Sequence, residues 1–72
     1  PGLRAPWDDV AAPTRAEIAD AQRALMAEGY DTGGDDGLPR FRTRRSLGAW
    51  QQARGLAPTC WPDRATLVAL AP

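Results

Sequence analysis

The sequence predicts an all-α fold, a small three-helix bundle. Apolar residues recur at spacings of three and four in three short stretches, which is the period of one helix face. The first two stretches each end at a glycine, Gly29 and Gly55, that can take the left-handed conformation closing a helix. An apolar residue follows each glycine and can fold back onto the last turn. The expected closing pairs are Leu25 with Tyr30 and Trp50 with Leu56.

Residues 1–13 precede the first of these stretches and are expected to form a linker. Three prolines in this segment favour extended backbone over helix. Trp7 is its largest apolar side chain, and we expect it to pack against the domain rather than contact a ligand. The three-helix domain is expected to cover residues 14–72.

The first helix is expected to start near Arg15, because Thr14 and Glu17 have the spacing of a capping box. In that motif each side chain accepts a hydrogen bond from the backbone of the other residue. We interpret Glu17 as this cap and not as a general acid, since a glycosidase needs a second carboxylate across a cleft. The expected inner face comprises Ile18, Ala21, Gln22, Leu25 and Met26.

Turn-forming and acidic residues fill the loop at residues 31–37, so a calcium site has to be considered. The pattern fails at two positions. The sixth residue of the loop is Asp36, where an EF-hand needs glycine, and the twelfth is Arg42, where it needs a bidentate glutamate. We therefore expect solvated turn carboxylates and no metal site.

The second helix is expected at about residues 42–54, with Thr43, Leu47 and Trp50 on its inner face. Gly48 interrupts this helix at a cost of about 1 kcal/mol relative to alanine. A packing or ligand reason for this glycine stays open, although drift at a tolerant position is the favoured interpretation.

The third helix is expected to follow Pro62, with Asp63 as its N-cap. Leu67 and Leu70 would then point inward. The expected core of the three helices comprises Ile18, Leu25, Leu47, Trp50, Leu56, Leu67 and Leu70.

The composition argues against an enzyme. The chain of 72 residues has no histidine, one serine and two glutamates, so most catalytic constellations are missing. Its single cysteine, Cys60, excludes an internal disulfide and a multi-cysteine zinc site. We expect no catalytic residues, no metal and no cofactor.

Nine arginines balance nine acidic residues, and lysine is absent. A net charge of zero lacks the long-range field of a dedicated nucleic-acid or membrane binder, so neither partner is expected. The sequence shows no signal peptide, membrane-spanning run or initiating methionine. We expect a domain excised from a larger protein that carries its own targeting signal.

The order of these residues resembles the bacterial peptidoglycan-binding domain, a non-catalytic three-helix module, over residues 14–70. The shared steps are Gly29-Tyr30, Asp36-Gly37, Thr43-Arg44, Trp50-Gln51, Gly55-Leu56, Asp63 and Thr66-Leu67. The chain departs from the family in two places. Arg40-Phe41 stands where the family commonly has Gly-Pro, and Cys60 stands where it generally has glycine.

The resemblance implies that the ligand is peptidoglycan, bound in a shallow groove beside the Asp-Gly loop and the start of the second helix. The ligand-binding residues it implies, with their neighbours, are Tyr30, Asp36, Gly37, Arg40, Thr43, Arg44 and Gln51. Tyr30 also fits the alternative role of closing the first helix.

An arginine cluster at Arg40, Arg42, Arg44 and Arg45 opens the second helix. Cations at a helix N-terminus are unfavourable because of the helix macrodipole, unless nearby acids neutralise them. One interpretation is therefore that the arginines form salt bridges with acids such as Asp35 and Asp36 and have a purely structural role. Recognition of the free carboxylates of peptidoglycan stem peptides is another, because arginine holds carboxylates by two-point contacts. A nucleic-acid contact is disfavoured by the balancing acids.

The amino-acid sequence of the linker resembles the segment between the catalytic and peptidoglycan-binding domains of lytic murein transglycosylases. This implies an exported, monomeric module of the bacterial cell envelope that is tethered to a catalytic domain. The alternative is a protein-interaction or regulatory domain on the same fold, using Trp7, Trp61 and the arginines. A glycan binder should have a groove between the Asp36 loop and the second helix, whereas an interaction domain should expose an apolar patch containing the tryptophans.

Overall fold

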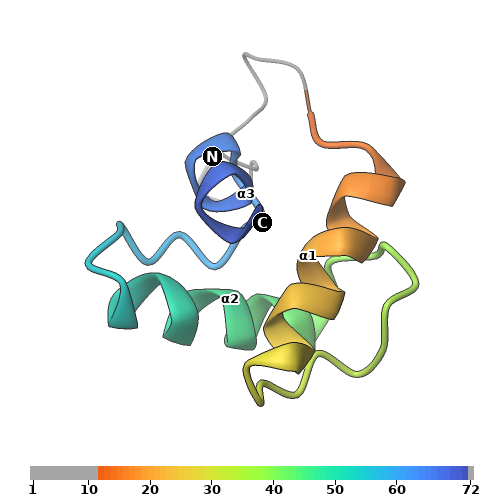
Figure 1. The fold of residues 1–72 in the computed structure, drawn as a ribbon, viewed down its shortest axis with the longest axis horizontal. Helices are drawn as coiled ribbons and strands as arrows, with labels where there is room; N and C mark the ends of the chain where they lie inside the picture. The colour runs from red at the N-terminus through yellow and green to blue at the C-terminus, as the bar shows by residue number, and fades with distance from the viewer. Residues whose placement is uncertain (1–11, 72) are drawn as a thin grey trace.

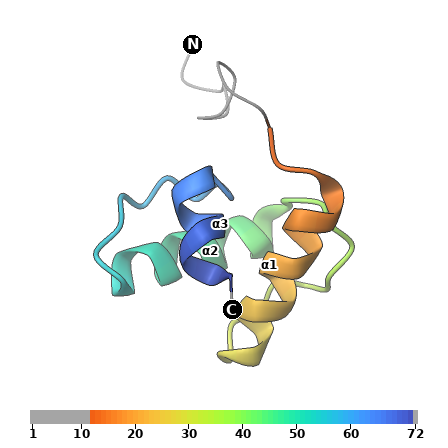
Figure 2. The same ribbon diagram turned by 45° about the horizontal axis from the view of Figure 1, so that its top comes forward.

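The computed structural model describes residues 12–71, which form three helices joined by two loops (Figure 1). The helices are α1 (Arg15–Ala27), α2 (Phe41–Ala53) and α3 (Arg64–Leu70), and the described residues contain no strand. Helix α1 packs against both α2 and α3 (Figures 1 and 2). The predicted all-α bundle is confirmed. The linker expected at residues 1–13 falls almost entirely outside the described residues, and Trp7 lies outside them.

Side-chain caps start α1 and α3, as the sequence predicts. Thr14 accepts a hydrogen bond from the Glu17 N–H (3.1 Å), and Glu17 accepts one from the Thr14 N–H (2.9 Å). At α3, Asp63 accepts a hydrogen bond from the Thr66 N–H (2.9 Å). Helix α2 differs, because its N-cap residue is Arg40, whose side chain makes no cap hydrogen bond. It also begins and ends one residue earlier than expected.

Both long helices end in the closure that their glycines predict. The N–H of Tyr30 donates to the carbonyl of Leu25 (3.0 Å) across Gly29, whose φ is 95°. The N–H of Leu56 donates in the same way to the carbonyl of Gln51 (2.8 Å). These are Schellman motifs, in which the residue after the glycine returns to the last turn. Tyr30 and Leu56 thereby pack against the core.

The core is a small cluster of Leu25, Leu47 and Trp50, each at most 1% exposed. Leu70 of α3 packs against this cluster together with the two closing residues. The expectation for Met26 is wrong, because 38% of its surface is exposed near the end of α1. The core therefore depends mainly on α1 and α2.

A buried glutamine of α1 holds the loop that leads to α2. Gln22 accepts a hydrogen bond from the Gly37 N–H (2.7 Å) through Oε1. Its Nε2 donates to the Leu38 carbonyl (3.1 Å) and to the Thr43 hydroxyl (2.9 Å). Thr43 is the third residue of α2, so one side chain fixes both the loop and the start of the next helix.

A buried glutamine of α2 repeats this arrangement in the loop that leads to α3. Gln51 accepts from the Cys60 N–H (2.9 Å), and its Nε2 donates to the Trp61 carbonyl (3.1 Å) and the Thr66 hydroxyl (2.7 Å). Cys60 has a φ of 63° and Gly37 one of 79°, so both loops use a left-handed residue at the same place. The two loops thus share one hydrogen-bonded conformation.

Candidate functional site

A surface groove of about 320 Å³ lies between the α1–α2 loop and the first turn of α2. It combines two apolar side chains, two guanidinium groups and one carboxylate with a hydroxyl and a glycine. The residues that line it are Thr32, Gly33, Asp36, Leu38, Arg40, Phe41 and Arg42. Polar groups with an apolar surface between them are typical of a ligand site.

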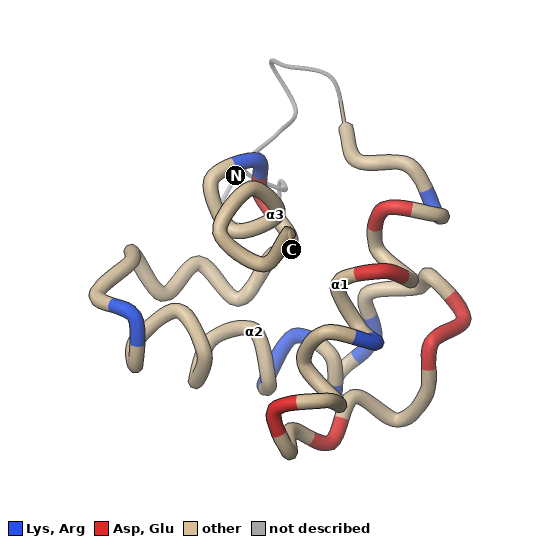
Figure 3. Tube along the Cα trace, viewed as in Figure 1, with Lys and Arg blue, Asp and Glu red and all other residues tan. Residues whose placement is uncertain are grey.

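Charge is unevenly distributed around this groove. The stretch from Gly37 to Pro62, which contains all of α2, holds five arginines and no acidic residue. Acidic residues lie instead on α1, in the α1–α2 loop and at the start of α3 (Figure 3). The start of α2 is therefore a local region of positive charge in a chain whose net charge is zero.

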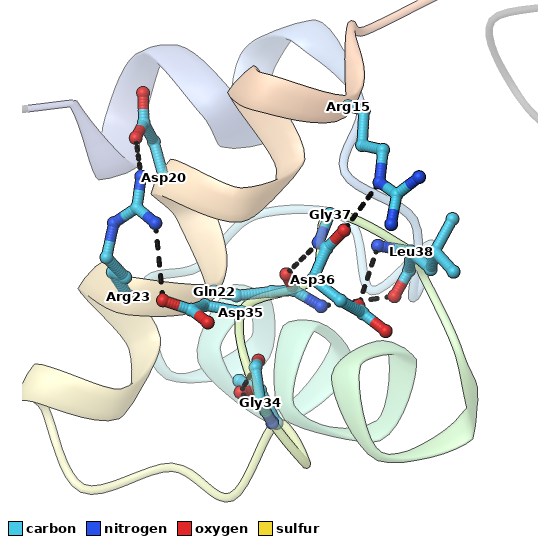
Figure 4. A network of polar contacts seen from close by, with 10 residues as sticks. Arg15, Asp20, Gln22, Arg23, Gly34, Asp35, Asp36, Gly37 and Leu38 are labelled. Atoms are coloured by element: carbon cyan, nitrogen blue, oxygen red, sulfur yellow. Dashed lines mark hydrogen bonds and ion pairs between the residues drawn. The ribbon is translucent and has the colours of Figure 1, made fainter.

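The loop wall of the groove is fixed around Asp36 and Gly37 (Figure 4). Asp36 Oδ1 accepts from the Leu38 N–H (3.0 Å), and its backbone carbonyl accepts from Arg15 Nε (2.7 Å). The Leu38 N–H is the main cause that lowers the pKa of Asp36, so this carboxylate stays ionised at the groove. Gly37 has to be glycine, because a Cβ atom there would collide with the backbone of Arg15.

Two arginines form the helix side of the groove. Arg40 Nη1 lies 3.6 Å from Asp36 Oδ2, and Arg42 Nη1 lies 3.7 Å from Asp31 Oδ2. Both separations exceed the usual range of an N–H···O hydrogen bond, and the arginine side chains are 72% and 63% exposed. Such loose surface ion pairs contribute little to stability.

The next two arginines of α2 lie against aromatic rings. The guanidinium of Arg44 is 4.1 Å from the ring centre of Trp61, and that of Arg45 is 5.4 Å from the ring centre of Phe41. Both distances are within the range of cation–π contacts. Phe41 is 72% exposed, an unusual position for a phenylalanine, and its ring lines the groove.

The residues expected from the sequence to bind a ligand divide into two groups. Asp36 and Arg40 line the groove, and Gly37 lies buried in its loop wall. The others lie elsewhere: Tyr30 closes α1, Arg44 stacks on Trp61, and Thr43 and Gln51 are at most 1% exposed and hydrogen-bonded within the loops.

The family motif did not mark Phe41 or Arg42 as lining residues of the groove, although Arg42 belongs to the arginine cluster considered for carboxylate recognition. Arg42 projects over Gly33, because a Cβ atom on this glycine would lie 3.2 Å from Arg42 Cδ. The available signal was the family departure at Arg40-Phe41, which marks this helix start as unusual.

Residues 14–70 match the family model of the peptidoglycan binding domain. The chain belongs to this family. No curated protein and no solved structure matched the chain. The resemblance read from the spaced motifs is confirmed, and the domain is a peptidoglycan-binding module of the cell wall in which no catalytic domain is evident.

Residues 12–71 contain no group of three or more histidine, cysteine, aspartate or glutamate residues that could hold a metal ion. Within the same residues, none of the three helices has the length and apolar character needed to cross a membrane.

Proposed function

We propose that this domain anchors a cell-wall lytic enzyme to bacterial peptidoglycan without taking part in the cleavage. The groove between the Asp36 loop and α2 is the observation that carries this proposal. It combines charged and apolar groups at the position where the family resemblance implies a groove for peptidoglycan. The proposed parent is an exported lytic murein transglycosylase of the cell envelope, and the domain acts as a monomer tethered to its catalytic domain.

The tryptophans support this function over a protein-interaction role. Trp50 belongs to the core, and Trp61 is partly buried with Arg44 against its ring. Neither is among the exposed large apolar side chains of residues 12–71, which are Met26, Phe41 and Val68. The exposed ring closest to a ligand site is Phe41, which lies in the groove itself.

Anchoring raises the local concentration of the catalytic domain on a polymeric substrate. A tether converts the second encounter with the wall into an intramolecular one, so even a weak site increases total binding. The proposed contacts are the exposed groove residues, which include Asp36 and Arg40.

The test compares the parent enzyme with and without residues 14–72. Removal should weaken binding to intact sacculi and slow their lysis, while cleavage of small soluble fragments should keep its rate. Equal losses on both substrates would show that the domain belongs to the catalytic fold, and the anchoring proposal would be wrong.

A further inference from the structure

We propose that the groove binds a free carboxylate of a peptidoglycan stem peptide and not the glycan strand. Arg40 and Arg42 would hold the carboxylate, and Phe41 would contact the aliphatic part of the neighbouring residue. This inference rests on the proposed function, because it assigns the part of peptidoglycan that the same groove recognises.

The first argument is that the groove arginines have unused hydrogen-bond donors. Three arginines outside the groove donate at short range: Arg15 to a carbonyl (2.7 Å), Arg54 to Glu28 (3.1 Å) and Arg64 to Glu17 (2.7 Å). Arg44 and Arg45 lie against aromatic rings instead. Within residues 12–71, the side chains of Arg40 and Arg42 donate no hydrogen bond and have only their loose ion pairs. Planar guanidinium forks with free donors are suited to a carboxylate.

The acids beside these arginines are held by the loop and do not close the groove. Asp31 Oδ1 accepts from the Gly33 N–H (3.0 Å), and Asp36 Oδ1 accepts from the Leu38 N–H (3.0 Å). Each carboxylate therefore faces its arginine with one oxygen at more than 3.5 Å. A ligand carboxylate could approach more closely and form the two-point contact that these acids do not make.

Arg42 is also held in place before a ligand arrives. The aliphatic part of its side chain lies over Gly33. This glycine has no side chain, so it leaves room for Arg42 that a larger residue would fill. Positioning a flexible arginine in advance lowers the entropy cost of binding. Gly33 is therefore a positioning residue for the proposed contact.

The backbone at the start of α2 adds further hydrogen-bond donors without acceptors, its N–H groups. In α1 and α3 a side chain accepts from an N–H group of the first turn. In α2 the N–H groups of Phe41, Arg42 and Thr43 have no acceptor among the described residues, and the first turn has no acidic residue. A carboxylate beside Arg40 and Arg42 would be favoured by these groups as well.

A sugar fits this groove less well than a carboxylate. Stacking on a sugar needs an open aromatic face, and the Arg45 guanidinium lies over one of the two faces of Phe41, 5.4 Å from the ring centre. The charged side chains of the groove supply mainly donors, whereas sugar hydroxyl groups require donors and acceptors together. Phosphate shares the chemistry of a carboxylate, and phosphate-containing wall polymers are therefore a separate arm of the test.

The experiment measures cosedimentation of the 72-residue chain with sacculi in three forms: intact and free of teichoic acid, stripped of stem peptides by an amidase, and intact with teichoic acid retained. The test variants are Arg40→Gln/Arg42→Gln and Arg40→Lys/Arg42→Lys. Arg23→Gln/Arg64→Gln removes the same charge outside the groove and is the matched control. Thermal unfolding followed by circular dichroism establishes that each variant is folded.

We expect the wild-type chain to bind intact teichoic-acid-free sacculi and to bind stripped sacculi at least about tenfold more weakly. The glutamine pair should lose a similar factor on intact sacculi, and the lysine pair should lose part of it because the charge remains without the fork. The control pair should bind within about twofold of wild type.

Two results would overturn the carboxylate assignment and leave the proposed function standing. These are equal binding to stripped and intact sacculi, and a folded glutamine pair that binds like wild type. Binding that requires teichoic acid would overturn both, because the ligand would then not be peptidoglycan. A wild-type chain that binds none of the three preparations would instead refute the proposed function. A soluble stem peptide should compete with sacculi, and the same peptide with its carboxylates amidated should not.

Discussion

The Sγ atom of Cys60 lies 2.6 Å from the position that a Cβ atom on Gly48 would occupy. Gly48 is buried in the middle of α2, and Cys60 is in the loop before α3. The glycine therefore has a packing reason, and the interpretation of drift at a tolerant position is wrong. Two unusual residues therefore explain each other. The side chain of Cys60, at a position where the family generally has glycine, fills the space beside Gly48 in α2.

This contact predicts a coupling between substitutions at the two positions. Gly48→Ala alone should destabilise the domain by about 1 kcal/mol or more, because the clash with Sγ exceeds the gain in helix propensity. Cys60→Gly relieves a left-handed backbone and should be close to neutral or stabilising by about 1 kcal/mol. Denaturant unfolding of the four members of a double-mutant cycle measures the coupling.

The double variant Gly48→Ala/Cys60→Gly should be more stable than wild type, with a coupling free energy of about 1–3 kcal/mol. Additive effects of the two substitutions would show that the sulfur moves away without cost. In that case Gly48 would need another explanation.

Gln51 is predicted to stabilise the α2–α3 loop. Gln51→Met keeps the approximate shape but removes the acceptor of the Cys60 N–H and the donor to Thr66. Leaving these groups unpaired should cost about 2–4 kcal/mol, and the melting temperature should fall by more than about 10 °C. Gln52→Met, at the exposed neighbouring position, is the control and should change stability by at most about 0.5 kcal/mol. A similar small effect at Gln51 would contradict this role.

The lowered pKa of Glu17 predicts that the folded domain loses stability in acid. Its hydrogen bond with Arg64, together with the Thr14 N–H, lowers the pKa of this carboxyl from 4.5 to about 2. Because the pKa is lower in the folded state, this stabilisation is fully present above pH 4.5 and is lost as the pH falls towards 2. The difference in melting temperature between wild type and Glu17→Gln should therefore be largest above pH 5 and shrink towards pH 2.

Carboxyl titration by NMR tests the cause directly. In Arg64→Gln the pKa of Glu17 should rise towards 4.5, because Arg64 is the largest contributor to the shift. An unchanged Glu17 titration in this variant would show that the ion pair between α1 and α3 is not formed in solution.

Phe41 is predicted to serve binding and not folding. Phe41→Ala removes a ring that is 72% exposed, so the free energy of unfolding should change by at most about 0.5 kcal/mol. Binding to sacculi should weaken several-fold, because the apolar surface of the groove is lost. Val68→Ala removes a similarly exposed apolar side chain from α3 and should leave binding unchanged. Equal binding by both variants would exclude Phe41 from the ligand site.

The helices were predictable because their boundaries are encoded locally. The capping box of Thr14 and Glu17 and the closing residues Gly29 and Gly55 depend on neighbours within a few positions. The hydrogen bonds of the loops were not predictable in this way, since the partners of Gln51 come from 8 to 15 positions later in the chain. A usable signal was present in the repeated pattern of a proline four residues before a threonine, at Pro39 and Pro62.

The candidate groove was predicted in position but not in composition. Asp36 and Arg40 were expected there from the family motif and its neighbours. Whether Arg42 points into the groove depends on the loop passing beneath it at Gly33, which no sequence spacing determines. For the same reason Thr43 and Gln51 were assigned to a ligand from the motif alone, while their burial and hydrogen bonds became visible only in the folded domain.

The most direct test of peptidoglycan binding is a sedimentation isotherm of the 72-residue chain with purified, protein-free sacculi. Cellulose is the control polymer, because it sediments equally well and lacks both amino sugars and stem peptides. We predict saturable depletion of the folded chain from the supernatant by sacculi and none by cellulose. A chain that stays in the supernatant at every concentration of sacculi, while circular dichroism shows that it is folded, would contradict the account.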